Sequence, residues 1–256
     1  MARVMGIVNV TPDSFYPQSR AWSVDDAIAR GRDLFTAGCD FVDVGGESTR
    51  PGATPVDEAD ELERVVPVVA ALSREGQVSV DTHKAEVARA AVAAGARVIN
   101  DVSASLADLA GSLGVGYVAM HRQGDPATMQ LAPAYDDVVS DVGDFLDDVA
   151  ARARSAGVTD LWLDPGIGFG KTVAHNLSLL ARLDDLVARA RAYGAGVLVG
   201  TSRKRFLANL GAHELDVDER LEGSIATEAW AMLCGVDVVR VHDAPAAIHL
   251  RELVGS

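Results

Sequence analysis

Short runs of valine, isoleucine and leucine alternate along this chain with longer segments in which apolar residues recur at helical spacing. Each short run ends at glycine or at polar residues, which is typical of a strand buried in a parallel sheet. Eight strands are predicted in this way, at residues 4–10, 41–46, 78–82, 98–101, 117–121, 161–166, 197–200 and 238–242.

A helical pattern follows each predicted strand, for example at residues 24–37, 58–73, 85–94 and 138–156. Ser23 precedes Asp26 by three residues and resembles a capping box, and Gly38 is a suitable stop for that helix. After the seventh strand the pattern is interrupted by a polar stretch that contains Gly211. We therefore expect two helices there, over residues 203–210 and 218–233.

Eight alternations of strand and helix in 256 residues predict a protein of the α/β class with a single (β/α)8 TIM barrel. An open, doubly wound sheet is the alternative, because periodicity does not show whether the sheet closes. No linker, charge block or internal repeat divides the chain, so residues 1–256 are predicted to form one domain.

Composition narrows the possible partners. The chain has 37 acidic and 23 basic residues and a net charge of −14, which argues against binding to nucleic acid or to an anionic membrane surface. No apolar run approaches the roughly 20 residues needed to span a bilayer, and no secretory signal is visible. Cys39 and Cys234 are predicted to be buried free thiols, which fits a cytoplasmic protein.

Polar side chains stand at the end of every predicted strand. In a TIM barrel the reactive groups lie on the loops that follow the strands, so these positions carry particular weight. Each has an alternative structural explanation, such as a helix cap for Asn100 or a rim histidine for His121. Together they favour a ligand site, and they are Asn9 and Thr11, residues 47–50, Asp81, Asn100 with Asp101, His121, Asp164, residues 202–204, and Arg240 with His242.

The mixture of side chains indicates the kind of ligand. Carboxylates and an amide suit a flat heterocycle with several N–H donors and ring acceptors, and they are available at Asp81, Asn100 and Asp164. Cationic side chains suit a phosphate or carboxylate group, and they are available at Arg50, Lys204, Arg240 and His242. A substrate with a polar ring at one end and an anionic group at the other is therefore expected.

A glycine-rich segment, Gly-Ile-Gly-Phe-Gly-Lys-Thr at residues 166–172, resembles a phosphate-binding P-loop. That loop requires a glycine six positions before its lysine, where Pro165 stands in this chain. ATP or GTP binding is therefore not expected. The glycines instead predict a tight loop beside Asp164, with Phe169 available as an apolar wall.

Taken together, several motifs resemble the dihydropteroate synthase family. In chain order they are Met5-Gly-Ile-Val-Asn9-Val-Thr-Pro-Asp13-Ser-Phe15, Gly45-Gly-Glu-Ser-Thr-Arg50-Pro-Gly52, Ser79-Val-Asp81-Thr82, Ile99-Asn100-Asp101-Val102, residues 120–130, Asp164-Pro-Gly-Ile-Gly-Phe-Gly-Lys171, Ser202-Arg-Lys204 and Arg240-Val-His242-Asp243. The resemblance implies that p-aminobenzoate displaces pyrophosphate from 6-hydroxymethyl-7,8-dihydropterin diphosphate and gives 7,8-dihydropteroate. It also implies that Mg²⁺ assists, that the protein is a homodimer and that sulfonamides compete with aminobenzoate.

The resemblance also implies a role for individual residues. The catalytic group consists of Asp81, Asp164, Lys204, Arg240 and His242. The pterin ring is expected to be held by Asp81, Asn100, Asp164 and Lys204, with Met120 as an apolar neighbour. Pyrophosphate is expected to meet Asn9 through the metal, Arg240 and His242 directly, and Arg50 or Ser48 and Thr49 from the second loop. The aminobenzoate is expected to lie beside Thr49, Pro51, Phe169, Ser202 and Phe15.

The first loop departs from the family pattern. The family commonly continues Asp-Ser-Phe as Ser-Asp-Gly-Gly, whereas this chain continues with Tyr16, Pro17, Gln18 and Ser19. Pro17 fixes a backbone angle and two glycines are missing, so the loop is expected to be stiffer. One interpretation is a lineage variant that still works; the other is weaker catalysis or altered access for aminobenzoate and sulfonamides.

Two other functions remain open at this point. One is a pterin-binding homologue that does not join the two substrates, although retained pyrophosphate contacts such as Lys204 and Arg240 argue against it. The other is a pterin-dependent methyltransferase barrel. The Gly-Glu-Ser-Thr-Arg-Pro sequence at residues 46–51 favours the synthase over both.

Overall fold

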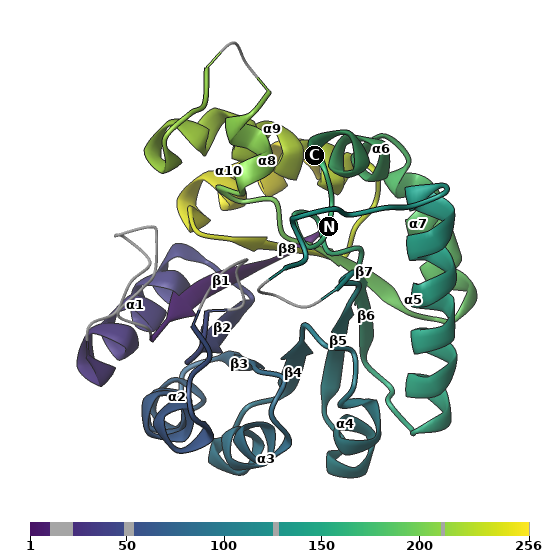
Figure 1. Ribbon diagram of the computed structural model, residues 1–256. Helices are drawn as coiled ribbons and strands as arrows, with labels where there is room; N and C mark the ends of the chain where they lie inside the picture. Colours follow the sequence, from purple (N-terminus) through teal and green to yellow (C-terminus); the bar gives the residue numbers. More distant parts are fainter. Residues whose placement is uncertain (11–22, 49–53, 125–127, 211–212, 256) are drawn as a thin grey trace.

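Eight parallel strands close into a barrel in the order β1 to β8, with helices around the outside (Figure 1). The computed structural model describes residues 1–10, 23–48, 54–124, 128–210 and 213–255. Strand β1 pairs with β2 on one side and with β8 on the other, so the sheet has no free edge. The predicted TIM barrel is therefore confirmed, and the alternative of an open sheet is wrong.

The described elements follow one another in the predicted alternation. The strands are β1 (Arg3–Asn9), β2 (Phe41–Gly45), β3 (Gln77–Asp81), β4 (Val98–Asp101), β5 (Gly116–Met120), β6 (Leu161–Asp164), β7 (Gly196–Val199) and β8 (Val238–Val241). The helices are α1 (Val24–Ala37), α2 (Glu58–Leu72), α3 (Ala85–Ala94), α4 (Ala107–Leu113), α5 (Val138–Ser155), α6 (Val173–Ala181), α7 (Leu183–Ala192), α8 (Arg205–Ala208), the 3₁₀ helix η2 (Val217–Arg220), α9 (Leu221–Leu233) and α10 (Ala244–Val254).

Local signals fix the ends of several elements. The Ser23 hydroxyl accepts from the backbone N–H of Asp26 at 3.1 Å and caps α1, which ends at Gly38 in the left-handed region with φ 102°. Strand β6 ends two residues earlier than predicted because the Asp164 carboxylate accepts from the N–H of Gly166 at 2.7 Å and turns the chain. The helix predicted from residue 203 starts only at Arg205, because Arg203 has a left-handed φ of 55°.

The inside of the barrel has an apolar layer and a polar layer. Alternate residues of a strand point to the same face, so the residues that face inward are spaced by two. Near the amino ends of the strands these residues form one apolar cluster: Met5, Phe41, Val98, Val118, Trp162, Leu198 and Val238. Two positions further along, the same faces carry polar side chains, including Asp43 after Phe41, Asn100 after Val98 and Asp164 after Trp162.

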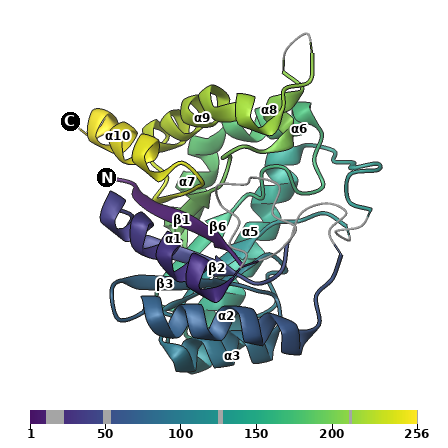
Figure 2. The same ribbon diagram turned by 90° about the vertical axis from the view of Figure 1, so that its left-hand side faces the viewer.

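The helices cover the outside of the barrel and form the larger core with it. Figure 2 shows α1, α2 and α3 packed along the outer side of the first strands, with α9 and α10 side by side. Both cysteines are free thiols as predicted; Cys39 is buried, but Cys234 is partly exposed because it caps the end of α9. Within the part of the chain that the structure describes, no helix is long and apolar enough to cross a membrane.

Candidate functional site

The residues predicted to hold a heterocycle come together at the carboxyl ends of neighbouring strands. Asp81 on β3 lies beside Asn100 on β4 in the strand register, and Asp164 on β6 lies beside Met120 on β5. All four side chains are buried. Segments far apart in the sequence therefore contribute carboxylate, amide and thioether groups to one end of the barrel.

A hydrogen-bonded network crosses this end of the barrel. Arg240 on β8 donates from Nε to Asp43 Oδ2 at 2.6 Å and from Nη2 to Asp81 Oδ2 at 2.8 Å. The amide of Asn100 donates to the same Asp43 oxygen at 2.9 Å. A single guanidinium thus joins β2, β3 and β8, and Asp43 connects it to β4.

Asp43 is a site residue that the sequence analysis missed. It is fully buried on β2, and its carboxylate accepts from both Arg240 and Asn100. A signal was present in the sequence, because Asp43 stands two residues after Phe41 in an otherwise apolar strand and so faces the barrel interior. It was not predicted because it lies in the middle of β2 and not at its end.

Burial and charge act against each other on these groups. Burial raises the pKa of the Asp81 carboxyl to about 7, although the nearby Arg240 guanidinium lowers it. The carboxylates of Asp43 and Asp81 raise the pKa of Arg240 despite its burial, so the guanidinium stays charged. The site therefore holds a fixed cation next to a carboxyl that titrates near neutrality.

Lys204 follows β7 and interacts with the charge of Asp164. Its ammonium donates to the carbonyl of Ile167 and stands 4.7 Å from the centre of the Phe169 ring. Burial lowers the pKa of Lys204 to about 8, while Asp164 raises it. Burial likewise raises the pKa of Asp164, and Lys204 opposes that rise. This pair places a second cation and a second carboxyl beside Arg240 and Asp81.

The loops after β7 and β8 are tied to each other. The Ser202 hydroxyl, which is buried, accepts from the backbone N–H of His242 at 3.1 Å. Arg203 forms a bidentate pair with Asp243 through distances of 2.8 and 2.9 Å. The Arg203–Asp243 pair and the Ser202–His242 bond thus hold the two loops together.

The remaining predicted residues end the first two strands or follow them in the sequence. Asn9 ends β1 and pairs with Gly45 in the register, and Ser48 follows β2 with a half-buried side chain. Phe15, Thr49, Arg50 and Pro51 lie outside the described residues. Among the residues that are described, no group of three or more histidine, cysteine, aspartate or glutamate side chains is arranged to hold a metal ion.

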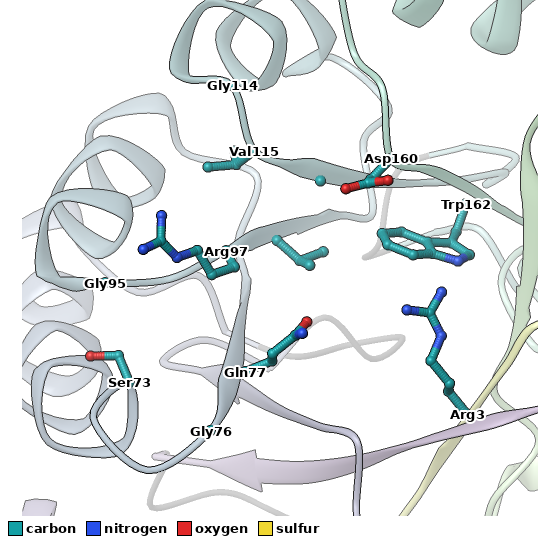
Figure 3. A pocket seen from close by; sticks show the side chains of 12 residues that line it. Arg3, Ser73, Gly76, Gln77, Gly95, Arg97, Gly114, Val115, Asp160 and Trp162 are labelled. Carbon is teal, nitrogen blue, oxygen red and sulfur yellow. The ribbon is translucent and has the colours of Figure 1, made fainter.

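A cavity of about 710 Å³ lies at the other end of the barrel (Figure 3). Its lining includes Arg3, Gln77, Arg97, Asp160 and Trp162, all near the amino ends of strands. The guanidinium carbon of Arg3 stands 4.9 Å from the ring centre of Trp162 and 4.9 Å from that of Phe41. This hollow is therefore separate from the network around Arg240.

Comparisons with known proteins agree on one family. The sequence profile of the pterin binding enzymes matches residues 5–242. Dihydropteroate synthase of Escherichia coli K12 is 42% identical over 259 residues, which cover 98% of this chain and 90% of that protein.

Two solved structures are similar in both sequence and fold. Yersinia pestis dihydropteroate synthase with a sulfonamide drug has a TM-score of 0.92 at 39% identity, covering 99% of this chain and 93% of that one. Burkholderia cenocepacia dihydropteroate synthase complexed with 7,8-dihydropteroate has a TM-score of 0.86 at 39% identity, covering 100% and 91%.

Proposed function

The chain belongs to the dihydropteroate synthase family of pterin-binding enzymes, and from that premise we propose how its residues perform the reaction. The enzyme is a transferase that condenses 6-hydroxymethyl-7,8-dihydropterin diphosphate with p-aminobenzoate to give 7,8-dihydropteroate and pyrophosphate. The observation that carries the assignment of roles is the convergence of Asp81, Asn100, Asp164 and Lys204 at the carboxyl end of the barrel.

In this proposal the pterin ring binds between β3, β4 and β6. Asp81 and Asp164 accept from ring N–H groups, and the Asn100 amide both donates and accepts. Lys204 donates to the ring from the opposite side, and Met120 gives an apolar contact. The other carboxylate oxygen of Asp81, Oδ1, is buried and has no hydrogen-bond partner among the residues that the structure describes. This supports the assignment, because an unpaired buried oxygen costs free energy that a ring N–H donor offsets.

The reaction breaks the C–O bond between the pterin methylene and the diphosphate and forms a C–N bond to the aminobenzoate amine. The electron pair of the C–O bond leaves with pyrophosphate, and the amine later loses a proton. Positive charge that develops on the methylene is opposed by Asp81 and Asp164. Arg240 and His242 are proposed to neutralise the leaving diphosphate, with help from Ser48, Thr49 and Arg50.

Magnesium is proposed to arrive with the diphosphate rather than to reside in the protein. Asn9 can contribute an amide oxygen, and the described residues bring no three histidine, cysteine, aspartate or glutamate side chains together as ligands, which fits a cation that keeps several waters and is bound mainly by substrate phosphates. When bound, Mg²⁺ supplies further neutralisation of the leaving group. Asn9 lies next to β2 and is proposed to hold it.

The aminobenzoate is proposed to lie at the mouth of the barrel. Phe169 stands beside the Lys204 ammonium and Ser202 is bonded to the His242 amide, which supports both as members of this pocket. Phe15, Thr49 and Pro51 are proposed to complete it. The amine is already nucleophilic, so positioning suffices and a covalent enzyme intermediate is not required. A sulfonamide would compete for the same place.

A product assay tests the proposed function. Purified protein is incubated with the pterin diphosphate, p-aminobenzoate and Mg²⁺, and both dihydropteroate and pyrophosphate are measured. The synthase is expected to form the two in equal amounts. Pterin binding without pyrophosphate release would identify the binding homologue, and methyl transfer from methyltetrahydrofolate would identify the methyltransferase.

The altered first loop is tested separately with one combined variant, Tyr16→Ser, Pro17→Asp, Gln18→Gly and Ser19→Gly. If the loop slows closure, the variant has a higher turnover number or a changed inhibition constant for a sulfonamide. Equal kinetics and equal inhibition would show that this chain's loop works as it stands.

Three broader features complete the proposal. The enzyme is proposed to act as one domain, as a homodimer and in the cytoplasm. Exposed apolar side chains on α9, Trp230 at 48% and Leu233 at 68%, support a subunit interface there. Two free thiols support a reducing compartment. Light scattering of the wild type and of a Leu233→Glu variant tests the dimer, which the added charge should dissociate.

A further inference from the structure

The loop between β6 and α6 has an unusual number of bonds to its carbonyl groups. Five consecutive carbonyls, at residues 166–170, each accept a hydrogen bond from a side chain. The donors are Lys171 to Gly166 and Phe169, Lys204 to Ile167, Gln130 to Gly168 and Tyr135 to Gly170. Carbonyl groups of surface loops commonly accept hydrogen bonds from water. Here side chains of the protein take that place and hold the loop.

Lys171 is the central donor of this set. Its side chain is only 3% exposed, and its Nζ lies 3.0 Å from the Gly166 carbonyl, 3.0 Å from the Phe169 carbonyl and 2.9 Å from His121 Nδ1. Burial lowers the pKa of Lys171 to about 7. Burial and the nearby charge of Lys171 lower the pKa of His121 to about 3, so this imidazole is neutral. Two N–H groups suffice for the two carbonyls in either protonation state of the lysine.

The loop is also pressed against the chain that follows β5. A side chain at Gly166 would bring its Cβ to 1.8 Å from the His121 carbonyl, and one at Gly170 to 2.3 Å from the Gln123 carbonyl. Both glycines have left-handed φ angles, 68° and 62°. The bond between Lys171 and His121 spans the same two segments, so the close approach and the buried amine act together.

We propose that Lys171 and His121 form a clasp, the contact between Lys171 Nζ and His121 Nδ1 together with the two loop carbonyls, that positions Phe169 and Lys204 for substrate binding. Lys171 and His121 are positioning residues, since neither is proposed to touch the substrate. The Phe169 carbonyl is bound directly by Lys171, and the neighbouring Ile167 carbonyl receives the Lys204 ammonium. This inference rests on the proposed function, in which Phe169 borders the aminobenzoate and Lys204 the pterin.

The clasp has a specific kinetic consequence. Asp81 and Asn100 belong to β3 and β4 and are hydrogen-bonded to Arg240 and Asp43, so much of the pterin site remains when the clasp is removed. Phe169, in contrast, loses a direct tether. Lys171→Met is therefore expected to raise the KM for aminobenzoate about tenfold, and the KM for the pterin diphosphate by a smaller factor.

A pair of substitutions at His121 isolates the contact made by Nδ1. Asparagine places a polar amide near the position of Nδ1, whereas phenylalanine keeps the ring contacts with Tyr135 and Phe145 but offers no polar atom. His121→Asn is expected to keep the KM for aminobenzoate within about twofold of the wild type, and His121→Phe to raise it about fivefold. Equal KM values for aminobenzoate in His121→Asn and His121→Phe would overturn the proposal. This test does not depend on whether Lys171→Met folds.

Arg154→Met is the matched control. Arg154 also donates to loop carbonyls, of Tyr193, Val158 and Thr159 at 2.7 to 2.9 Å, but at the amino end of the barrel. It should lower the melting temperature without changing either KM. A KM shift in Arg154→Met as large as in Lys171→Met would reduce the clasp to a general effect on stability.

Hydrogen exchange separates failure of this inference from failure of the proposed function. The backbone amides of residues 167–170 are expected to exchange faster in Lys171→Met than in the wild type. In Arg154→Met their exchange rates should equal those of the wild type. This readout holds whether or not the wild type forms dihydropteroate. Unchanged exchange in Lys171→Met would refute the clasp, whereas an inactive wild type with the expected exchange would refute only the proposed function.

Discussion

The two ends of the barrel use arginine in opposite ways. At the carboxyl end, Arg240 donates to Asp43 and Asp81 at 2.6 and 2.8 Å and joins three strands. At the amino end, Arg3 lies against the rings of Phe41 and Trp162, with its guanidinium carbon 4.9 Å from each centre. The first arrangement concentrates opposite charges that can act on a substrate; the second is a packing contact.

The size of a cavity does not locate the chemistry of this molecule. The 710 Å³ cavity is at the amino end, yet the carboxyls and ammonium groups with shifted pKa values that face one another, Asp81, Asp164 and Lys204, are at the carboxyl end. Strand direction explains this, because the loops that carry reactive groups in a TIM barrel follow the strands, whereas the opposite end serves stability.

Removal of the Asp81 charge should have the largest effect on the distinction between the ends. Asp81→Asn keeps the shape of the side chain but removes the negative charge that, in the proposed mechanism, opposes positive charge on the pterin methylene. We expect kcat to fall by about 100-fold or more, the magnitude typical of a lost electrostatic contact to a transition state. Steady-state kinetics measure this, and a circular dichroism spectrum like that of the wild type shows that folding is intact. Wild-type turnover would contradict the role in charge stabilisation.

Asp43→Asn should have the next largest effect. The change replaces a charge-assisted bond to Arg240 by a neutral one and leaves Asp81 as the ionised partner of the guanidinium. We expect kcat/KM to fall by about tenfold, which corresponds to about 1.4 kcal/mol. Asp160→Asn at the amino end is the control and should retain kcat/KM. Equal losses in the two variants would remove the distinction between the ends.

The pH dependence of kcat/KM tests the titrating groups at the carboxyl end. In the proposed mechanism Asp81 acts as a carboxylate, so kcat/KM should fall as the pH drops through its pKa of about 7. Lys204 is proposed to act as a cation, so kcat/KM should also fall as the pH rises through its pKa of about 8. A narrow bell-shaped profile is expected, in which kcat/KM falls about tenfold at one pH unit below the acidic pKa. A profile with the same acid limb in Asp81→Asn would show that another group titrates.

The sequence allowed the fold and much of the site to be predicted, because both depend on local patterns. Strand and helix periods gave eight alternations, and residues that end strands, such as Asp164 and Lys204, are brought together by the direction of a parallel barrel. The family resemblance named the same residues. One-dimensional patterns therefore suffice where the topology itself brings side chains together.

The contacts between distant side chains were not predictable in the same way. Asp43 was missed because it stands inside a strand rather than at its end. The contacts of Lys171 were missed because the Gly166 and Phe169 carbonyls and His121 meet its ammonium only after the loop turns back. Cys234 was predicted to be buried, but its place at the end of α9 leaves it partly exposed. Each depends on three-dimensional packing that periodicity does not encode.

The smallest effect on activity is expected at Arg3, and it tests the amino end directly. Arg3→Met replaces a guanidinium by a thioether that also packs against Phe41 and Trp162, so part of the stabilisation by about 0.5–1 kcal/mol per ring contact is retained. The melting temperature should fall by about 2–4 °C or less, and kcat/KM should stay within about twofold of the wild type. Calorimetry and the product assay measure the two quantities on the same sample.

A tenfold loss of kcat/KM in Arg3→Met would mean that the apolar layer transmits changes between the ends, because Phe41 and Asp43 lie two residues apart on β2. The chemistry would then depend on the packing beneath it as well as on the charges at the carboxyl end.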